Sequence, residues 1–410
     1  MLLRIALFSL FTLVSLQLHG QEKFRTGAEN FLGSGLELIK NKRVGIVTNH
    51  TALINGKIHL VDTLVKLATV TTLFGPEHGI RGDAPAGDQI GDSRDAATNL
   101  PVFSLYGKIR KPTPEMLQNV DVLIFDIQDV GARFYTYIST LYNCIESAAE
   151  NNKPIIVLDR ANPLGGSMVE GPVIKKDYYS FVGITELPVT HGMTTGELAQ
   201  YFNYKIREKK SIEANLRVIQ LSGWERSSKY SDLGQVFIKP SPNLADINSI
   251  LLYPGTCLLE ATNISEGRGT ATPFSLIGSP FINSGEVILS MKAHNFKGVE
   301  LTAMNFTPGD IPGMAINPKH KGILCQGIKL TVTDPQLFRP VEFGLALISE
   351  LKRLYPSDMK IKKDSFLRLC GSDEIYTELE HGNNFEKIIN LSARGVEEFK
   401  LLRKNFLIYK

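Results

Sequence analysis

"DVLIFDIQDVGARFYTYISTLYNCIESAAENNKPIIVLDR", residues 121–160, contains the pattern that decides the fold. Two apolar runs, "VLIF" (122–125) and "IIVL" (155–158), flank a stretch with a helical pattern. Each run is apolar on successive residues, which is typical of a central parallel strand buried on both faces. A strand, a helix and a second strand in this order form the crossover unit of an α/β protein. We therefore predict an α/β fold with a parallel sheet covered by helices.

The same alternation continues on both sides of this unit. Further strands are expected at 43–49, 69–75, 101–107 and 216–221, and helices at 59–68, 113–120 and 194–208. Three prolines between Lys239 and Gly255 then indicate a crossing into a second unit. Beyond it, strand patterns at 298–306 and 327–334 mix with helical patterns at 343–356, 365–371 and 395–407. We predict two domains, residues 21–245 and a smaller α+β domain over 246–410.

Composition supports a globular protein of this kind. The chain has 410 residues, 43% of them hydrophobic and 21% charged, which is ample apolar mass for a core and favours two domains over one. The net charge is only +3 and the basic residues are scattered. No nucleic-acid partner is therefore expected.

Residues 1–20 are typical of a signal peptide. One basic residue, Arg4, precedes a predominantly apolar stretch over 5–14, and the small residue Gly20 follows. The stretch is shorter than the roughly 20 residues that a bilayer-spanning helix needs. We therefore expect a periplasmic or secreted protein without stable membrane insertion. The four cysteines include no CxxC pair, so neither a zinc knuckle nor a redox motif is indicated.

Polar side chains follow four of the predicted strands. Because the carboxyl ends of parallel strands meet at one edge of a sheet, these side chains are expected to converge there. They are Asn49 and His50 after the first strand; Glu77, His78 and Arg81 after the second; Asp126, Asp129 and Arg133 after "VLIF"; and Asp159 and Arg160 after "IIVL". Glu77 stands out, since glutamate is neither a preferred turn former nor a good cap. Pro76 before it fixes the angle at which the chain enters this position, which suits a general acid.

Several kinds of chemistry lack their sequence motif. No GxGxxG follows a strand, and GxSxG and HExxH are absent. We therefore expect no cofactor and no metal, and acid–base chemistry by carboxylates remains. Glycoside hydrolysis is its most common extracellular use, with Glu77 paired to Asp126 or Asp129, or assisted by the carbonyl of a 2-acetamido sugar.

Five motifs together resemble the NamZ-type exo-β-N-acetylmuramidases. They are "FGPEHGIRGDAPAG" (74–87), "DVLIFDIQDVGARFYTYISTL" (121–141), "DRANPLGG" (159–166), "EGP" (170–172) and "LPVTHGMTTGELA" (187–199). The resemblance implies a hydrolase that removes N-acetylmuramic acid from the non-reducing ends of peptidoglycan fragments. It also implies a Rossmann-like N-terminal domain, a smaller C-terminal domain and a cleft between them. The glutamate of the PEHG motif, which is Glu77 here, would be catalytic.

From this resemblance we assign roles as hypotheses. Glu77 would protonate the glycosidic oxygen, and His78 or Asp126 would tune its charge or polarise the acetamido group. Arginine suits the lactyl carboxylate of muramic acid, because a guanidinium binds a carboxylate in a fork. The full substrate-binding set comprises Asn49, His50, Arg81, Asp129, Arg133, Tyr135, His191, Glu266 and Arg268. Tyr137 beside Tyr135 either contacts the sugar or packs in the core.

Two alternatives remain open at this point. One is a peptidoglycan-binding protein without catalytic turnover, which the presence of both Glu77 and His78 makes less favourable. The other is an amidase or deacetylase that acts on the same polymer through a metal, with ligands from separate loops. The sequence does not decide the oligomeric state.

Overall fold

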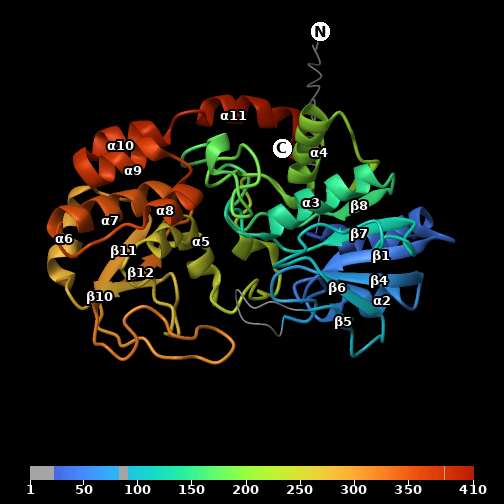
Figure 1. The fold of residues 1–410 in the computed structure, drawn as a ribbon, viewed down its shortest axis with the longest axis horizontal. Helices are drawn as coiled ribbons and strands as arrows, with labels where there is room; N and C mark the ends of the chain where they lie inside the picture. Colours follow the sequence, from blue (N-terminus) through green and yellow to red (C-terminus); the bar gives the residue numbers. More distant parts are fainter. Residues whose placement is uncertain (1–22, 83–90, 383) are drawn as a thin grey trace, which may run out of the picture.

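The computed structural model describes residues 23–82, 91–382 and 384–410, so the predicted signal peptide over 1–20 lies outside the described residues. Within these ranges, seven strands form the larger sheet, in the order β5-β6-β4-β1-β7-β8-β9 (Figure 1). Their bounds are β1 Arg43–Thr48, β4 Thr69–Gly75, β5 Ser93–Arg94, β6 Pro101–Ser104, β7 Val122–Asp126, β8 Ile155–Leu158 and β9 Leu216–Ile219. A separate hairpin joins β2 (Leu53–Ile54) to β3 (Ile58–His59).

The strands from β6 to β9 pair in parallel, and the short edge strand β5 pairs antiparallel with β6. The chain starts at β1 and moves outward to β4 and β6. It then returns to the other side of β1 for β7, β8 and β9. This is the strand order of a Rossmann sheet. The predicted α/β fold with a parallel sheet is confirmed.

The continuous apolar runs arise because both faces of the sheet are covered. Val122 and Ile124 of β7 pack with α1 (Gly27–Asn30) and α2 (Leu60–Leu64) on one face. Leu123 and Phe125 belong to the core that includes α3 (Tyr137–Glu150) and α4 (Thr195–Lys210) on the other face. Successive side chains of a strand point to opposite faces, so residues 122–125 of β7 are all apolar, and the charged Asp126 comes only at its end.

The second half of the chain forms a smaller antiparallel sheet with helices around it. The strands β10 (Leu276–Ser279), β11 (Val299–Ala303) and β12 (Gln326–Val332) lie in the order β10-β12-β11. The helices are α5 Ile247–Thr256, α6 Ser284–Ala293, α7 Pro340–Leu354, α8 Lys363–Cys370, α9 Asp373–Thr377, α10 Phe385–Ser392 and α11 Val396–Arg403. Helices α5 and α7 approach closely at Gly255, where an added β-carbon would lie 2.0 Å from the Pro340 carbonyl oxygen. The division at residue 245 stays a prediction.

The helix expected at 113–120 does not form. This segment is a series of turns, in which the Leu117 N–H bonds to the Thr113 and Pro114 carbonyls and the Val120 N–H to that of Leu117. A helix this short depends on packing for its stability. Here the turns already bury Leu117 and Val120, so the helical prediction was wrong.

The last residues of the chain return to the first half. The Tyr409 hydroxyl donates to Asp159 Oδ2 (2.5 Å), and the Ile408 N–H donates to Glu197 Oε1 (2.9 Å). The C-terminal tail therefore packs beside the end of β8 and the start of α4. Among the helices in the described ranges, none combines the length and apolarity needed to cross a membrane.

Candidate active site

Glu77 lies on a tight turn directly after β4. The Gly79 N–H closes the turn by bonding to the Pro76 carbonyl (3.0 Å). His78 has a φ of 70°, in the left-handed region that residues with a β-carbon rarely adopt. Such a conformation costs about 1–2 kcal/mol for a residue other than glycine. The strained turn places Glu77 and the buried His78 side by side at the end of the sheet.

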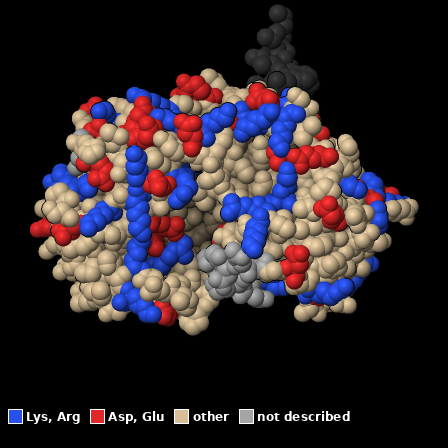
Figure 2. All heavy atoms as spheres, viewed as in Figure 1, with Lys and Arg blue, Asp and Glu red and all other residues tan. Residues whose placement is uncertain are grey.

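Glu77 lines a cavity of about 180 Å³ between the two halves of the chain. The surface is visibly hollowed between these halves in Figure 2. Loops that follow β4, β6 and β7 form one wall, and α5, the segment after it and the end of α8 form the other. The polar groups that line the cavity are Glu77, His78, Tyr106, Tyr135, Thr136, Ser241, Tyr253, Glu260 and Arg268.

A hydroxyl group holds the Glu77 carboxylate. The Thr136 hydroxyl donates to Glu77 Oε2 at 2.8 Å. Tyr106 lines the same cavity. Burial first, and the charge of Glu77 second, raise the pKa of Tyr106 to about 12, so its hydroxyl stays protonated. The carboxyl group is therefore fixed in orientation at the cavity wall.

Tyr135 lines the same cavity. Its ring is held edge-on by Tyr137 (4.8 Å between centroids) and by Tyr253 (6.0 Å). Burial, followed by these two tyrosines, raises the pKa of Tyr135 well above its usual value. Its buried hydroxyl has no partner at normal hydrogen-bond geometry in the described part of the chain.

The opposite wall is a network of charged groups. Arg268 Nε (3.1 Å) and Nη2 (2.6 Å) both donate to Glu260 Oε1, and Nε lies 3.4 Å from Glu266 Oε1. Lys319 bonds to Glu266 Oε2 at 2.9 Å. The guanidinium also lies over the Phe274 ring. Glu266 thus supports Arg268 without lining the cavity, and Arg268 keeps its Nη1 unbonded within the described residues.

Asp126 lies at the end of β7 but does not line the Glu77 cavity. Both of its oxygens accept from Arg160, Oδ1 from Nε (2.7 Å) and Oδ2 from Nη2 (2.8 Å). Asp126 is fully buried and Arg160 nearly so. A buried bidentate pair of this kind fixes the ends of β7 and β8 relative to each other.

Asn49, Asp129 and His191 gather nearby, also outside the cavity. Asn49 Oδ1 accepts from the backbone and the hydroxyl of Thr51. Asp129 Oδ2 accepts from the Gly131 N–H (2.7 Å) and lies 3.6 Å from His191 Nε2. His191 Nδ1 accepts from the Met193 N–H, which leaves the proton of a neutral ring on Nε2, facing Asp129.

The three remaining predicted residues have other partners. Arg81 bonds to Asp62 and Asp95, two donors to each, and the carboxylates raise its pKa. Arg133 is completely buried and donates to the carbonyls of Pro172, Leu187, Leu369 and Cys370, so it joins the two halves of the chain. His50 Nε2 lies 2.7 Å from the Lys239 carbonyl oxygen.

The structure thus brings His78, Tyr135 and Arg268 to Glu77 and places the other predicted residues outside this cavity. Sequence reasoning missed Tyr106, Thr136 and Glu260. Tyr106 had the same signal as the others, because it follows a strand of the sheet. Glu260 had none. In the described ranges, no group of three or more His, Cys, Asp or Glu is arranged to hold a metal ion.

The protein has a Rossmann-like sheet, and at the end of this sheet a hydroxyl donor holds a glutamate. The glutamate faces the second unit across a small cavity. These features define an α/β protein whose candidate site is centred on a carboxylate. Two family models match the chain. The model described as "Exo-beta-N-acetylmuramidase NamZ, N-terminal" matches residues 44–248. The model described as "Exo-beta-N-acetylmuramidase NamZ, C-terminal" matches residues 251–409. The chain belongs to the NamZ family of exo-β-N-acetylmuramidases, which are glycosidases, and the predicted resemblance is confirmed.

Individual relatives agree with this assignment. The chain is 45% identical over 390 residues to the peptidoglycan β-N-acetylmuramidase NamZ of Bacillus subtilis (strain 168), covering 94% of this chain and 92% of the relative. Two crystal structures of DUF1343 family proteins from Bacteroides fragilis share the fold. One has a TM-score of 0.87 at 33% identity and the other 0.78 at 34%. Each alignment covers 95% of this chain and 99% of the solved chain.

Proposed function

We propose that this protein is an exo-acting glycosidase that releases N-acetylmuramic acid from the non-reducing ends of peptidoglycan fragments, with Glu77 as its general acid. Family membership supports the reaction and substrate. The observation that carries the role of Glu77 is its position: it lines the cavity between the two halves, and the Thr136 hydroxyl holds it there. A small cavity suits one terminal sugar better than a strand threading through a cleft.

Three other residues complete the proposed site. Tyr135 would donate its unbonded hydroxyl to the sugar or its acetamido group. Arg268 would bind the lactyl carboxylate through its remaining donors, since it alone of the three predicted arginines lines the cavity. His78 would act next to Glu77 at the cavity wall. Asp126 acts through Arg160 and is a positioning residue in this proposal.

The test is release of N-acetylmuramic acid from a MurNAc–GlcNAc disaccharide by native protein and by Glu77→Gln, each with and without a chelator. Glu146→Gln is the matched control, because this glutamate lies on α3 and pairs with Lys111 and Lys210. We expect release by the native protein and the control, insensitive to chelator, and loss in Glu77→Gln. No release by native protein would favour a binding protein, and chelator-sensitive release would favour a metal-dependent hydrolase.

We propose in addition that the protein is exported and acts on the cell wall in the periplasm or outside the cell, in the recycling of peptidoglycan. The apolar residues 5–14 after Arg4 support this. N-terminal sequencing of the protein recovered from cell fractions tests it. A mature N-terminus near Gln21 in an extracytoplasmic fraction is expected, and an uncleaved cytoplasmic chain would contradict it.

A further inference from the structure

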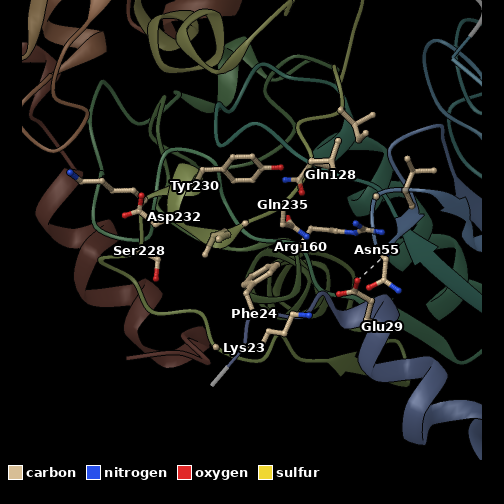
Figure 3. A pocket seen from close by; sticks show the side chains of 18 of the residues that line it. Lys23, Phe24, Glu29, Asn55, Gln128, Arg160, Ser228, Tyr230, Asp232 and Gln235 are labelled. Atoms are coloured by element: carbon tan, nitrogen blue, oxygen red, sulfur yellow. Dashed lines mark hydrogen bonds between the residues drawn. The ribbon is translucent and has the colours of Figure 1, made fainter. Parts of the chain in front are cut away.

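A second, larger cavity opens where the strand order of the sheet reverses. β1 pairs with β4 on one side and with β7 on the other. From β1 the chain adds β4 and then β6 on the first side, and it returns to the other side of β1 to form β7. In sheets of this kind, ligands bind beyond the carboxyl ends of the two strands at that point. The cavity has a volume of about 720 Å³, and Thr51 and Gln128 from the loops after β1 and β7 line it (Figure 3). This volume is within the range of roughly 300–1,000 Å³ for small-molecule sites.

The larger cavity is separate from the one around Glu77. The segment 238–244 runs between them: Ile238 lines the larger cavity, whereas Ser241 and Leu244 line the smaller. The Tyr137 hydroxyl fixes this segment by donating to the Pro240 carbonyl at 2.8 Å. The two cavities share no lining residue. The proposed catalytic groups therefore do not account for the larger one.

Neutral polar groups line the larger cavity without being used by the protein. The side chains of Asn55, Tyr230, Gln235 and Gln336 form no hydrogen bond with any described residue. Gln128 donates its Nε2 to the Asp129 and Ala161 carbonyls, which leaves its Oε1 as an acceptor. Figure 3 shows the Tyr230 hydroxyl and the Gln128 amide directed to the same part of the cavity. Amide and hydroxyl groups of this number suit a ligand rich in hydroxyls and amides.

Aromatic rings and an equal number of positive and negative charges further restrict the chemical class of the ligand. The rings of Phe24 and Tyr230 both line the cavity and offer apolar faces to a sugar. Equal numbers of cationic and anionic residues line the cavity, namely the cationic Lys23, Arg160 and Lys229 and the anionic Glu29, Glu225 and Asp232. Asp126 already occupies the fork of Arg160. A phosphate or polyanion would need an excess of positive charge here, whereas a neutral saccharide would not.

We propose that this cavity is a second saccharide-binding site, which takes neutral N-acetylglucosamine units of a glycan. The proposal rests on the proposed function, because the substrate polymer is the source of the ligand. N-Acetylmuramic acid carries a lactyl carboxylate, but the N-acetylglucosamine units that alternate with it are uncharged. The charge-balanced cavity selects the uncharged unit, and the Glu77 cavity with Arg268 selects the charged one.

The test is titration calorimetry of the purified protein with tetra-N-acetylchitotetraose. We expect binding by native protein, and a Kd at least tenfold weaker in Tyr230→Ala and in Gln235→Ala. Tyr230→Phe keeps the aromatic ring, so it replaces Tyr230→Ala in the test if the alanine variant does not fold. We expect a smaller loss of affinity in Tyr230→Phe. The matched control is Tyr204→Ala, a half-buried tyrosine of α4 that lines neither cavity, and its Kd should equal that of native protein.

Glu77→Gln distinguishes the two cavities, and it should bind chitotetraose as native protein does. Absence of binding by native protein, an unchanged Kd in both Tyr230→Ala and Gln235→Ala, or a loss in Glu77→Gln equal to theirs would each overturn the proposal. Because binding is measured without turnover, an inactive protein that still binds chitotetraose through Tyr230 would refute the proposed function and support this site.

Discussion

Two glutamates of the first half face the second half of the chain, and their surroundings differ. Glu77 lines a cavity and accepts a hydrogen bond from the Thr136 hydroxyl of its own half. Glu170 instead accepts from the Val341 N–H at the start of α7 (3.2 Å) and lies 3.4 Å from Arg339 Nε, both in the second half. Burial raises the pKa of Glu170 to about 7.

The difference teaches which carboxylate is available for chemistry. Glu170 accepts a hydrogen bond from the first turn of α7, so it joins the two halves. Glu77 contacts open space between them and can reach a substrate. We therefore expect substitutions of Glu77 to change turnover and substitutions of Glu170 to change stability.

The largest expected effect is on enzymatic activity, which Glu77→Gln should lower and Glu170→Gln should not. On a MurNAc–GlcNAc disaccharide, Glu77→Gln should lower kcat by about 10²–10⁴-fold, the usual contribution of a general acid. On a nitrophenyl β-N-acetylmuraminide the loss should be much smaller, because nitrophenolate leaves without protonation. Glu170→Gln should stay within twofold of native protein on both. An equal loss of Glu77→Gln on both substrates would contradict its role as proton donor.

The next effect concerns the wall opposite Glu77. Arg268→Gln removes the charged donor proposed for the lactyl group, so kcat/KM on the β-N-acetylmuraminide should fall about 10–100-fold, as for hydrogen bonds to charged groups. Activity on the matching β-N-acetylglucosaminide, which lacks the lactyl group, should not change. Arg81→Gln is the control, since Arg81 is paired with Asp62 and Asp95. A parallel fall on both substrates in Arg268→Gln would show a structural role only.

A smaller effect is expected from the group that orients Glu77. Thr136→Val removes the hydrogen bond to Glu77 Oε2 and keeps the shape of the side chain, so kcat on the disaccharide should fall about tenfold. Thr140→Val is the control, because its hydroxyl donates to the Thr136 carbonyl on the helix instead. The two variants should melt at similar temperatures. If Thr140→Val lost as much activity, the effect would belong to α3 and not to Glu77.

The smallest effect concerns Glu170 and pH. Its pKa is about 7 in the folded protein against a usual value of 4.5, so between these pH values the folded state binds the proton more tightly than the unfolded state. Its contribution to stability is therefore present below about pH 4.5 and is lost as pH rises through about 7. The native protein should therefore lose a few degrees of Tm between pH 5 and pH 8 through Glu170, and Glu170→Gln should not show this loss. Thermal melts across this range measure it, and an identical decline in both proteins would refute the assignment.

The sequence contained enough information to predict the sheet and one wall of the site. Strands such as "VLIF" are apolar at every position because both faces of the sheet are covered, and that pattern is visible without a structure. The polar residue after each strand is equally visible, and this identified Glu77. Whether such a residue faces a cavity is a different matter. Asp126 and Glu77 both follow strands, and only the structure shows that Arg160 takes up both oxygens of Asp126.

The other wall was much harder to predict. Glu260 lies on a 3-10 turn at Cys257–Ala261, and nothing in the residues around it indicates that it faces a loop almost two hundred positions earlier. Arg268 was predicted only through the chemistry of the lactyl group. Arg133 looked like a substrate ligand, but its four carbonyl partners come from three distant segments that fold together around it. Contacts of this kind depend on how the halves pack, which local patterns do not contain.

The C-terminal tail has a consequence for how the protein is made. The side chains of Asp159 and Glu197, buried beside β8 and α4, receive hydrogen bonds from Tyr409 and from the Ile408 backbone. The Arg226 N–H likewise meets the Lys410 carbonyl. Tyr409 and Asp159 are separated by 250 positions in the chain. The Rossmann-like sheet therefore gains these contacts only after the segment around Tyr409 has been synthesised.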